Sequence, residues 1–132
     1  MATNQCTAAF AVPSEDMRKL LFLFAAVAFA QHPWPPAGLR CPERTLVVLK
    51  TDPAKAAKAG GFFDEHLAYV RSLMKSGKVV FAGPLQDGGG AMVFAITEWN
   101  EVEEILKKEP FNREGIMTVA THAVWQACEP AP

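Results

Sequence analysis

The pattern of apolar and polar positions predicts regular structure from residue 45 onward. Thr45–Leu49 is a short apolar run rich in β-branched residues and bounded by Arg44 and Lys50, which is typical of a buried central strand. After a loop, the period changes to that of a helix, with one apolar stripe made of Phe63, Leu67, Val70 and Met74. We therefore predict a strand, a loop and an amphipathic helix that begins near residue 62 and ends at Gly77.

Four further elements follow in the chain. Two apolar segments, 79–82 and 91–96, flank the glycine-rich stretch LQDGGG and are predicted to be two strands joined by a loop. Residues 99–109 form a second helix whose buried stripe comprises Val102, Ile105 and Leu106, while its glutamates and lysines face solvent. Pro110 ends this helix, a loop follows, and residues 116–126 form a long last strand.

The order β-α-β-β-α-β predicts an α+β fold of the ferredoxin-like kind. Right-handed crossovers give one antiparallel four-stranded sheet in the spatial order fourth, first, third, second, with both helices on one face. The other face would expose apolar side chains to water. We therefore expect a homodimer packed sheet to sheet.

The first thirty residues are predicted to be a leader rather than part of the domain. Arg18 and Lys19 precede an apolar run that ends in Ala28 and Ala30, the arrangement of a secretory signal peptide over residues 17–30. The polar residues 1–16 suggest that translation starts at Met17. We expect export to the periplasm or the medium, with no stable membrane span after cleavage following Ala30. The alternative is a cytoplasmic protein in which this segment is a buried or surface-docked helix.

A proline-rich linker, residues 31–44, is expected to precede a domain over residues 45–128. Cys41 lies just before the first strand and Cys128 just after the last, and these strands are predicted neighbours that run antiparallel. In an oxidising compartment the two thiols could form a disulfide, which would contribute about 4–5 kcal/mol in the chain-entropy model. The alternative is two free thiols on frayed ends.

Composition and motifs limit the function. The 132 residues carry a formal net charge of −1 with no basic run, so nucleic acid is not an expected partner. The three histidines and three cysteines lack metal-ligand spacing, and no phosphate-binding glycine motif or nucleophile elbow is present. We predict no metal, no cofactor and no covalent nucleophile.

The predicted topology brings chemically active side chains to one end of the domain. His66 lies near the start of the first helix, Asp87 in the loop between the middle strands, and Arg113 in the loop after the second helix. A carboxylate that accepts a hydrogen bond from one imidazole nitrogen leaves the other nitrogen free to move a proton. His66 and Asp87 are therefore the candidate catalytic pair. The alternative is a structural role for each, with His66 packed in the domain and Asp87 capping a turn.

The remaining candidates would bind substrate. The loop amides of Gly88 and Gly89 could hold an anionic oxygen, and the guanidinium of Arg113 could pair with a substrate carboxylate. The other candidates are Gly83, Pro84 and His122. His122 either faces the inner cavity of the dimer or is a core histidine whose ring nitrogens are hydrogen-bonded within the protein.

These residues also carry a family resemblance. The segments HLAYVRSLMKSGKVVFAGPLQDGGG and EPFNREGI, with a final strand ending in Trp125, resemble the YCII-related family across residues 45–126. The resemblance implies a dimeric α+β barrel related to muconolactone isomerase, with His66 and Asp87 at the positions of the family's proposed catalytic pair. One member is a dehydrochlorinase acting on a chlorinated hydroxyhydroquinone, and most have no established reaction. The secretory leader departs from the usual bare single domain.

The expected function is proton-transfer chemistry on a small oxygenated or aromatic molecule, either an elimination such as dehydrochlorination or an isomerisation. The alternative is a non-catalytic module that has the same dimeric barrel and serves to bind a small ligand or to interact with a partner.

Overall fold

The computed structural model describes residues 33–132. The predictions for the leader, its cleavage after Ala30 and a start at Met17 lie outside these residues. Residues 33–38 belong to a separate unit of the chain, and the domain comprises Leu39–Pro132. Its elements are β1 (Leu39–Arg40), β2 (Glu43–Thr51), the 3-10 turn η1 (Ala56–Lys58), α2 (Ala59–Lys75), β3 (Val79–Pro84), β4 (Gly90–Phe94), α3 (Trp99–Lys108), α4 (Pro110–Arg113), β5 (Met117–Gln126) and β6 (Glu129–Pro130).

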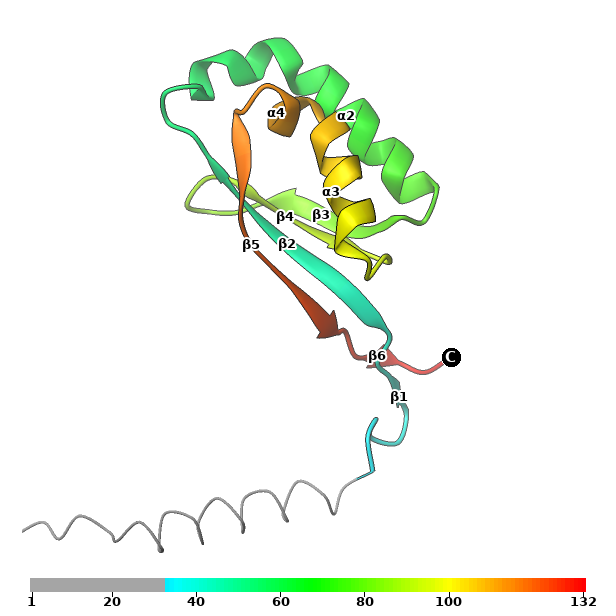
Figure 1. Cartoon of the computed structure of the whole chain (residues 1–132). Helices are drawn as coiled ribbons and strands as arrows, with labels where there is room; N and C mark the ends of the chain where they lie inside the picture. Colours follow the sequence, from blue (N-terminus) through cyan, green and yellow to red (C-terminus); the bar gives the residue numbers. More distant parts are fainter. Residues whose placement is uncertain (1–32) are drawn as a thin grey trace, which may run out of the picture. The chain divides into compact units, whose positions relative to one another are not determined.

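The main sheet has four antiparallel strands in the order β3-β4-β2-β5, which confirms the predicted fold class and strand order (Figure 1). The central strand β2 pairs with β4 on one side and with β5 on the other. β2 and β5 pair along their whole lengths, from Glu43 opposite Gln126 to Thr51 opposite Met117. These two strands therefore define the long axis of the sheet, with Glu43 and Gln126 at one end and Thr51 and Met117 at the other.

The helices cover one face of the sheet, as predicted, and the core lies beneath them (Figure 1). Val47 and Phe94 from the sheet are fully buried, and the predicted stripe of α3, Val102, Ile105 and Leu106, is buried as well. The stripe predicted for α2 is wrong at both ends, because Phe63 and Met74 are exposed. The buried residue of that helix is Leu73, with Tyr69 and Val70 packed against the core.

Two short features differ from the expectation. The segment after α3 was predicted to be a loop, but Pro110–Arg113 form the helix α4. Proline is well placed at the first helical position, since its fixed φ suits the helix and its missing N–H would have no partner there. β1 and the start of β2 also fall in the stretch expected to be linker, because Leu39 and Arg40 pair with β6.

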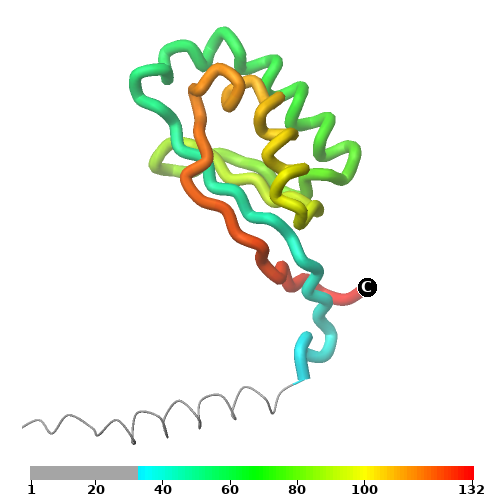
Figure 2. Tube along the Cα trace, viewed as in Figure 1, coloured from blue at the N-terminus to red at the C-terminus, as the bar shows by residue number. Residues whose placement is uncertain are grey.

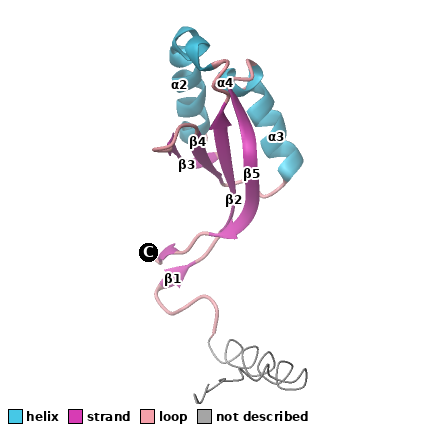
Figure 3. Cartoon of the chain, turned by 90° about the vertical axis from the view of Figure 1, so that its left-hand side faces the viewer, coloured by secondary structure: helices cyan, strands magenta, loops and turns pink. Residues whose placement is uncertain are grey.

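No helix of the described residues covers the opposite face of the sheet. Figure 3 looks onto this face and shows the four strands in front of the helices. Large apolar side chains on it remain open to solvent, including Phe81, 65% exposed, and Trp125, 48% exposed. Phe81 pairs with Val93 and Trp125 with Arg44, so these four residues share the open face.

The start of β2 and the end of β5 lie side by side at the lower end of the domain in Figure 2. Cys41 and Cys128, the two cysteines expected to pair, form a disulfide there. Beyond it, β1 and β6 make a two-stranded sheet, and Arg40 forms an ion pair with Glu129 at 2.9 Å. Within the described part of the chain, no helix is long and apolar enough to cross a membrane.

Candidate active site

His66 lies on α2, on the side of this helix that meets α4. Its Nδ1 lies 2.6 Å from Oε1 of Glu109, and its ring stacks on Phe111 at 4.1 Å between ring centroids. The stack and the hydrogen bond fix both the plane and the rotation of the imidazole. Because a carboxylate accepts hydrogen bonds, Nδ1 carries the proton that faces Glu109, and Nε2 is the acceptor when the ring is neutral.

Glu109 is the buried carboxylate of the domain, with only 1% of its side chain exposed. Pro110 holds the preceding residue in an extended conformation, and Glu109 accordingly has ψ 126° and acts as the N-cap of α4. Its carboxylate accepts hydrogen bonds from the backbone amides of Phe111 and Asn112 and from the side-chain amide of Asn112. With His66 Nδ1, four donors therefore surround the two oxygens.

A cavity of about 320 Å³ opens beside this pair. The helix layer contributes Phe63, Leu67, Val70 and Phe111 to its wall, and the sheet contributes Leu49, Met92 and Met117. Phe63 and Leu67 line this space, and Val70 both lines it and packs against the core, so the stripe predicted for α2 faces the cavity over most of its length. The cavity is thus apolar except at His66 and Glu109.

The β3–β4 hairpin closes one side of the cavity. Among the residues predicted to bind substrate, Gly83, Pro84 and Gly89 line the wall, whereas Gly88 does not. Gly89 has φ +98°, and a Cβ there would meet the carbonyl oxygen of Leu49. Only glycine fits both conditions, so the backbone approaches β2 closely and gives a smooth wall.

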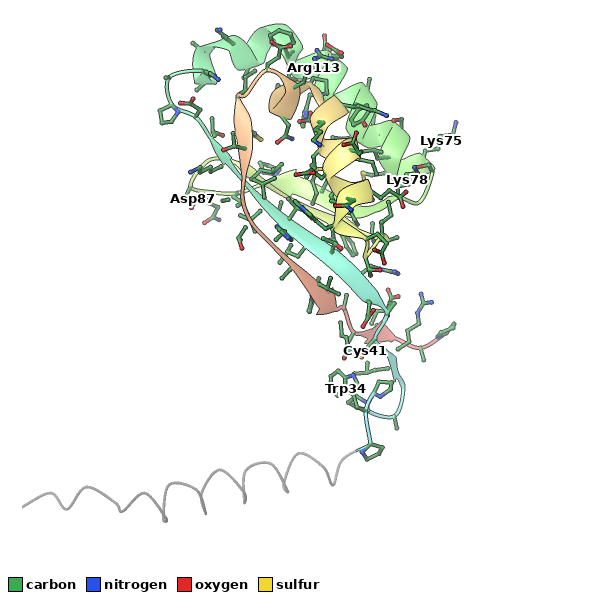
Figure 4. The ribbon with its side chains drawn as sticks, viewed as in Figure 1. Trp34, Cys41, Lys75, Lys78, Asp87 and Arg113 are labelled. Atoms are coloured by element: carbon green, nitrogen blue, oxygen red, sulfur yellow. A yellow bond between two sulfur atoms is a disulfide. The ribbon has the colours of Figure 1, made fainter. Side chains whose placement is uncertain are left out.

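The structure does not bring Asp87 to His66. Asp87 is exposed in the hairpin loop, where Figure 4 shows it at the outer end of the loop, and it is not among the residues that line the cavity. The carboxylate at Nδ1 of His66 is that of Glu109. The catalytic role expected for Asp87 stays a prediction.

Arg113 and His122 also lie outside the cavity. The guanidinium of Arg113, labelled in Figure 4, makes two hydrogen bonds to the carboxylate of Glu65 and one to Glu114. These bonds tie α4 to α2 on the outer surface, so the guanidinium already has carboxylate partners within the domain. His122 pairs with Val47 on the helix side of the sheet and stacks on Trp99 at 3.5 Å.

The pKa values of Glu65 and Tyr69, both on α2, are shifted from their ordinary values. The hydrogen bond from Arg113 lowers the pKa of Glu65, aided by the positive charge of the guanidinium. Burial raises the pKa of Tyr69, and the negative charge of Glu109 raises it further. Tyr69 donates a hydrogen bond to the carbonyl of Ile105 at 3.0 Å, which holds α2 against α3 just below the pair.

Glu109 is the functional candidate that reasoning from the sequence missed. It lies 43 residues from His66 and follows a charged helix, so it resembles one more solvated glutamate. The available signal was the acidic residue directly before Pro110. An acidic residue followed by proline can mark the N-cap and first position of a new helix, where a carboxylate can accept from free amides.

The structure is thus a ferredoxin-like α+β domain in which a histidine and a buried carboxylate lie beside an apolar cavity. The chain belongs to the YCII-related domain family, whose model matches residues 44–126. A solved structure with this fold is 5-chloro-2-hydroxyhydroquinone dehydrochlorinase from Burkholderia phenoliruptrix AC1100, determined in complex with 2,5-dihydroxybenzoquinone. It shares 22% sequence identity with a TM-score of 0.50, and the similarity covers 63% of this chain and 91% of the other. No curated protein matches the chain.

Proposed function

We propose that this protein is a small-molecule enzyme in which His66 moves a proton during an elimination or isomerisation. The observation that carries the proposal is the 2.6 Å hydrogen bond between His66 Nδ1 and the buried Glu109, at the edge of an apolar cavity. Family membership and the fold shared with a dehydrochlorinase support a reaction of this kind.

The mechanism follows from the state of the imidazole. Nδ1 is engaged by Glu109, while Nε2 has no hydrogen-bond partner among the described residues. As a neutral acceptor, Nε2 would take a proton from a carbon or oxygen of the substrate, and Glu109 would stabilise the imidazolium that forms. In an elimination, the electron pair of the broken bond to hydrogen forms a double bond as the leaving group departs. In an isomerisation, the imidazolium returns the proton at a different atom.

The experiment is a screen of chlorinated hydroquinones and hydroxyquinones, followed by chloride release and ultraviolet absorbance. For any compound turned over, we expect His66→Asn to lower kcat about 10²–10⁴-fold, the usual contribution of a general acid–base group. Glu104→Gln, an exposed glutamate on α3, is the control and should retain the wild-type rate. Equal turnover by His66→Asn would contradict the proposal, and ligand binding with no turnover would favour the non-catalytic binding module.

A homodimer formed through the open sheet face is part of this proposal. The exposed side chains of Phe81 and Trp125 support it, because a monomer would leave that apolar surface in water. Sedimentation velocity should give a dimer for the wild-type protein and a monomer for Phe81→Glu. A wild-type protein that sediments as a monomer at all concentrations would remove the dimer from the proposal.

Export is also proposed, and the disulfide between Cys41 and Cys128 supports it because such bonds persist in oxidising compartments. Expression of the full chain in a bacterial host should yield a periplasmic product that begins at Gln31. An uncleaved cytosolic protein would favour the cytoplasmic alternative.

A further inference from the structure

The polar groups beside the cavity leave few ways to hold a ligand. A carboxylate offers about four lone-pair positions, and the four donors around Glu109 occupy that number. Glu109 is therefore saturated by the protein and has no position left for a ligand hydroxyl. Among the cavity-lining side chains, Nε2 of His66 is the hydrogen-bonding position that remains.

Positive charge is kept out of this space. No lysine or arginine is among the residues that line the cavity. Arg113 is held on the outer surface by Glu65 and Glu114. An anionic ligand would thus leave water for an apolar space, beside the negative charge of Glu109 and without a lysine or arginine of the described residues to pair with. Burial of an unpaired charge is strongly unfavourable.

The dimensions limit the ligand as well. A dry apolar cavity of about 150 Å³ is enough for benzene, and this one is about 320 Å³. The aromatic rings of Phe63 and Phe111 and the backbone at Gly83 and Gly89 form part of the cavity wall. One or two planar rings can lie between such surfaces with full van der Waals contact.

We propose that the cavity selects an uncharged compound of one or two rings that donates one hydrogen bond to Nε2 of His66, and that it rejects carboxylates of the same shape. This charge selection rests on one part of the proposed function, namely that the ligand binds in the cavity. It replaces the expectation that Arg113 would receive a substrate carboxylate.

The test compares 2-naphthol with 2-naphthoate, which have the same rings but differ in charge at neutral pH. Each is titrated into the disulfide-bonded full chain and followed by methionine methyl NMR. Met92 and Met117 line the cavity, whereas Met74 on α2 does not, so it serves as an internal control. We expect 2-naphthol to shift the Met92 and Met117 signals and to bind at least tenfold more tightly than 2-naphthoate.

A charge-reversal variant sharpens the test. Met117→Lys places a cation in the cavity wall and should reduce or invert the preference in favour of 2-naphthoate. Met74→Lys adds the same charge to an exposed position of α2 and should leave the preference unchanged. If Met117→Lys does not fold, the wild-type comparison alone still decides the question.

The outcomes separate this inference from the proposed function. Equal or tighter binding of 2-naphthoate by the wild-type protein overturns the charge selection, as does failure of 2-naphthol to shift the cavity methionines. Selective binding of 2-naphthol by a protein that turns over no compound supports the selection and contradicts only the catalytic role. Turnover of carboxylate substrates would support catalysis and overturn the selection.

Discussion

Two regions of the domain, the N-terminus of α4 and the β3–β4 hairpin loop, each carry a carboxylate, but they present it in opposite ways. In the α4 region, Glu109 is buried and accepts from His66 and from two backbone amides. In the β3–β4 hairpin loop, Asp87 is exposed at the outer end (Figure 4). The difference lies in the neighbouring backbone, since Pro110 starts a helix whose free amides surround Glu109. A carboxylate becomes buried where local donors satisfy it.

The largest expected difference between the regions is in stability. Glu109→Ala leaves His66, Asn112 and two backbone amides without their acceptor and removes the cap of α4. We expect it to lower the free energy of unfolding by about 3–5 kcal/mol, as for loss of one partner of a buried pair. Asp87→Ala changes an exposed loop side chain and should stay within about 0.5 kcal/mol. Urea denaturation measures the loss in free energy of unfolding for each variant. Equal losses would show that the hydrogen bonds of Glu109 stabilise the fold no more than Asp87 does.

The second difference concerns turnover, measured on any substrate that the screen identifies. Glu109→Gln keeps the size of the side chain but removes the charge that stabilises the imidazolium of His66. We expect kcat to fall about 10²-fold or more, and to fall less for Asp87→Asn. The reverse order would mean that the hairpin loop brings Asp87 to the reacting atoms when substrate binds, as the family resemblance implies.

Two adjacent glycines test the hairpin itself. Gly88 and Gly89 both have positive φ, but only at Gly89 would a Cβ meet neighbouring backbone, at Leu49. Gly88→Ala should cost about 1–2 kcal/mol, the price of a left-handed conformation with a side chain. Gly89→Ala should cost about 1–3 kcal/mol more, because β2 must shift. Thermal unfolding compares the two, and equal costs would contradict the close approach.

The smallest effect is on the ionisation of Tyr69, the single tyrosine of the chain. Its pKa is raised above the usual 10.0 by burial and then by the charge of Glu109. Any stability that Tyr69 contributes is therefore present below about pH 10 and is lost as pH rises through the higher folded value. Absorbance of tyrosinate near 295 nm should show a lower pKa in Glu109→Gln than in the wild type and no change in Asp87→Asn. Equal effects of the two variants would place Glu109 farther from Tyr69 than the structure does.

The fold was predictable because it depends on patterns that lie close together in the sequence. The apolar run of β2 and the stripe of α3 each specify one element, and the hairpin pattern specifies the two strands β3 and β4. Crossover handedness then fixes the strand order. The site was only partly predictable. Local sequence marks His66 as a candidate, but it does not show that a glutamate 43 residues later turns inward to meet it.

The prediction that the apolar stripe of α2 is buried was wrong for a related reason. Phe63, Leu67 and Val70 follow the helical period, yet they line the cavity. Periodicity identifies the face of a helix that avoids water, but it does not distinguish a packed core from a space reserved for a ligand.

The disulfide has a practical consequence for handling this protein. Cys41 and Cys128 are separated by 87 positions, and the bond joins the chain just before β2 to the chain just after β5. The polypeptide thus enters and leaves the domain at one end of the β2–β5 pair (Figure 2), whereas Leu49 and Met117 near the other end of this pair line the cavity. A surface tether or fusion partner attached after Pro132 would leave the cavity mouth unobstructed, and a single protease cut between the cysteines would leave both fragments covalently joined.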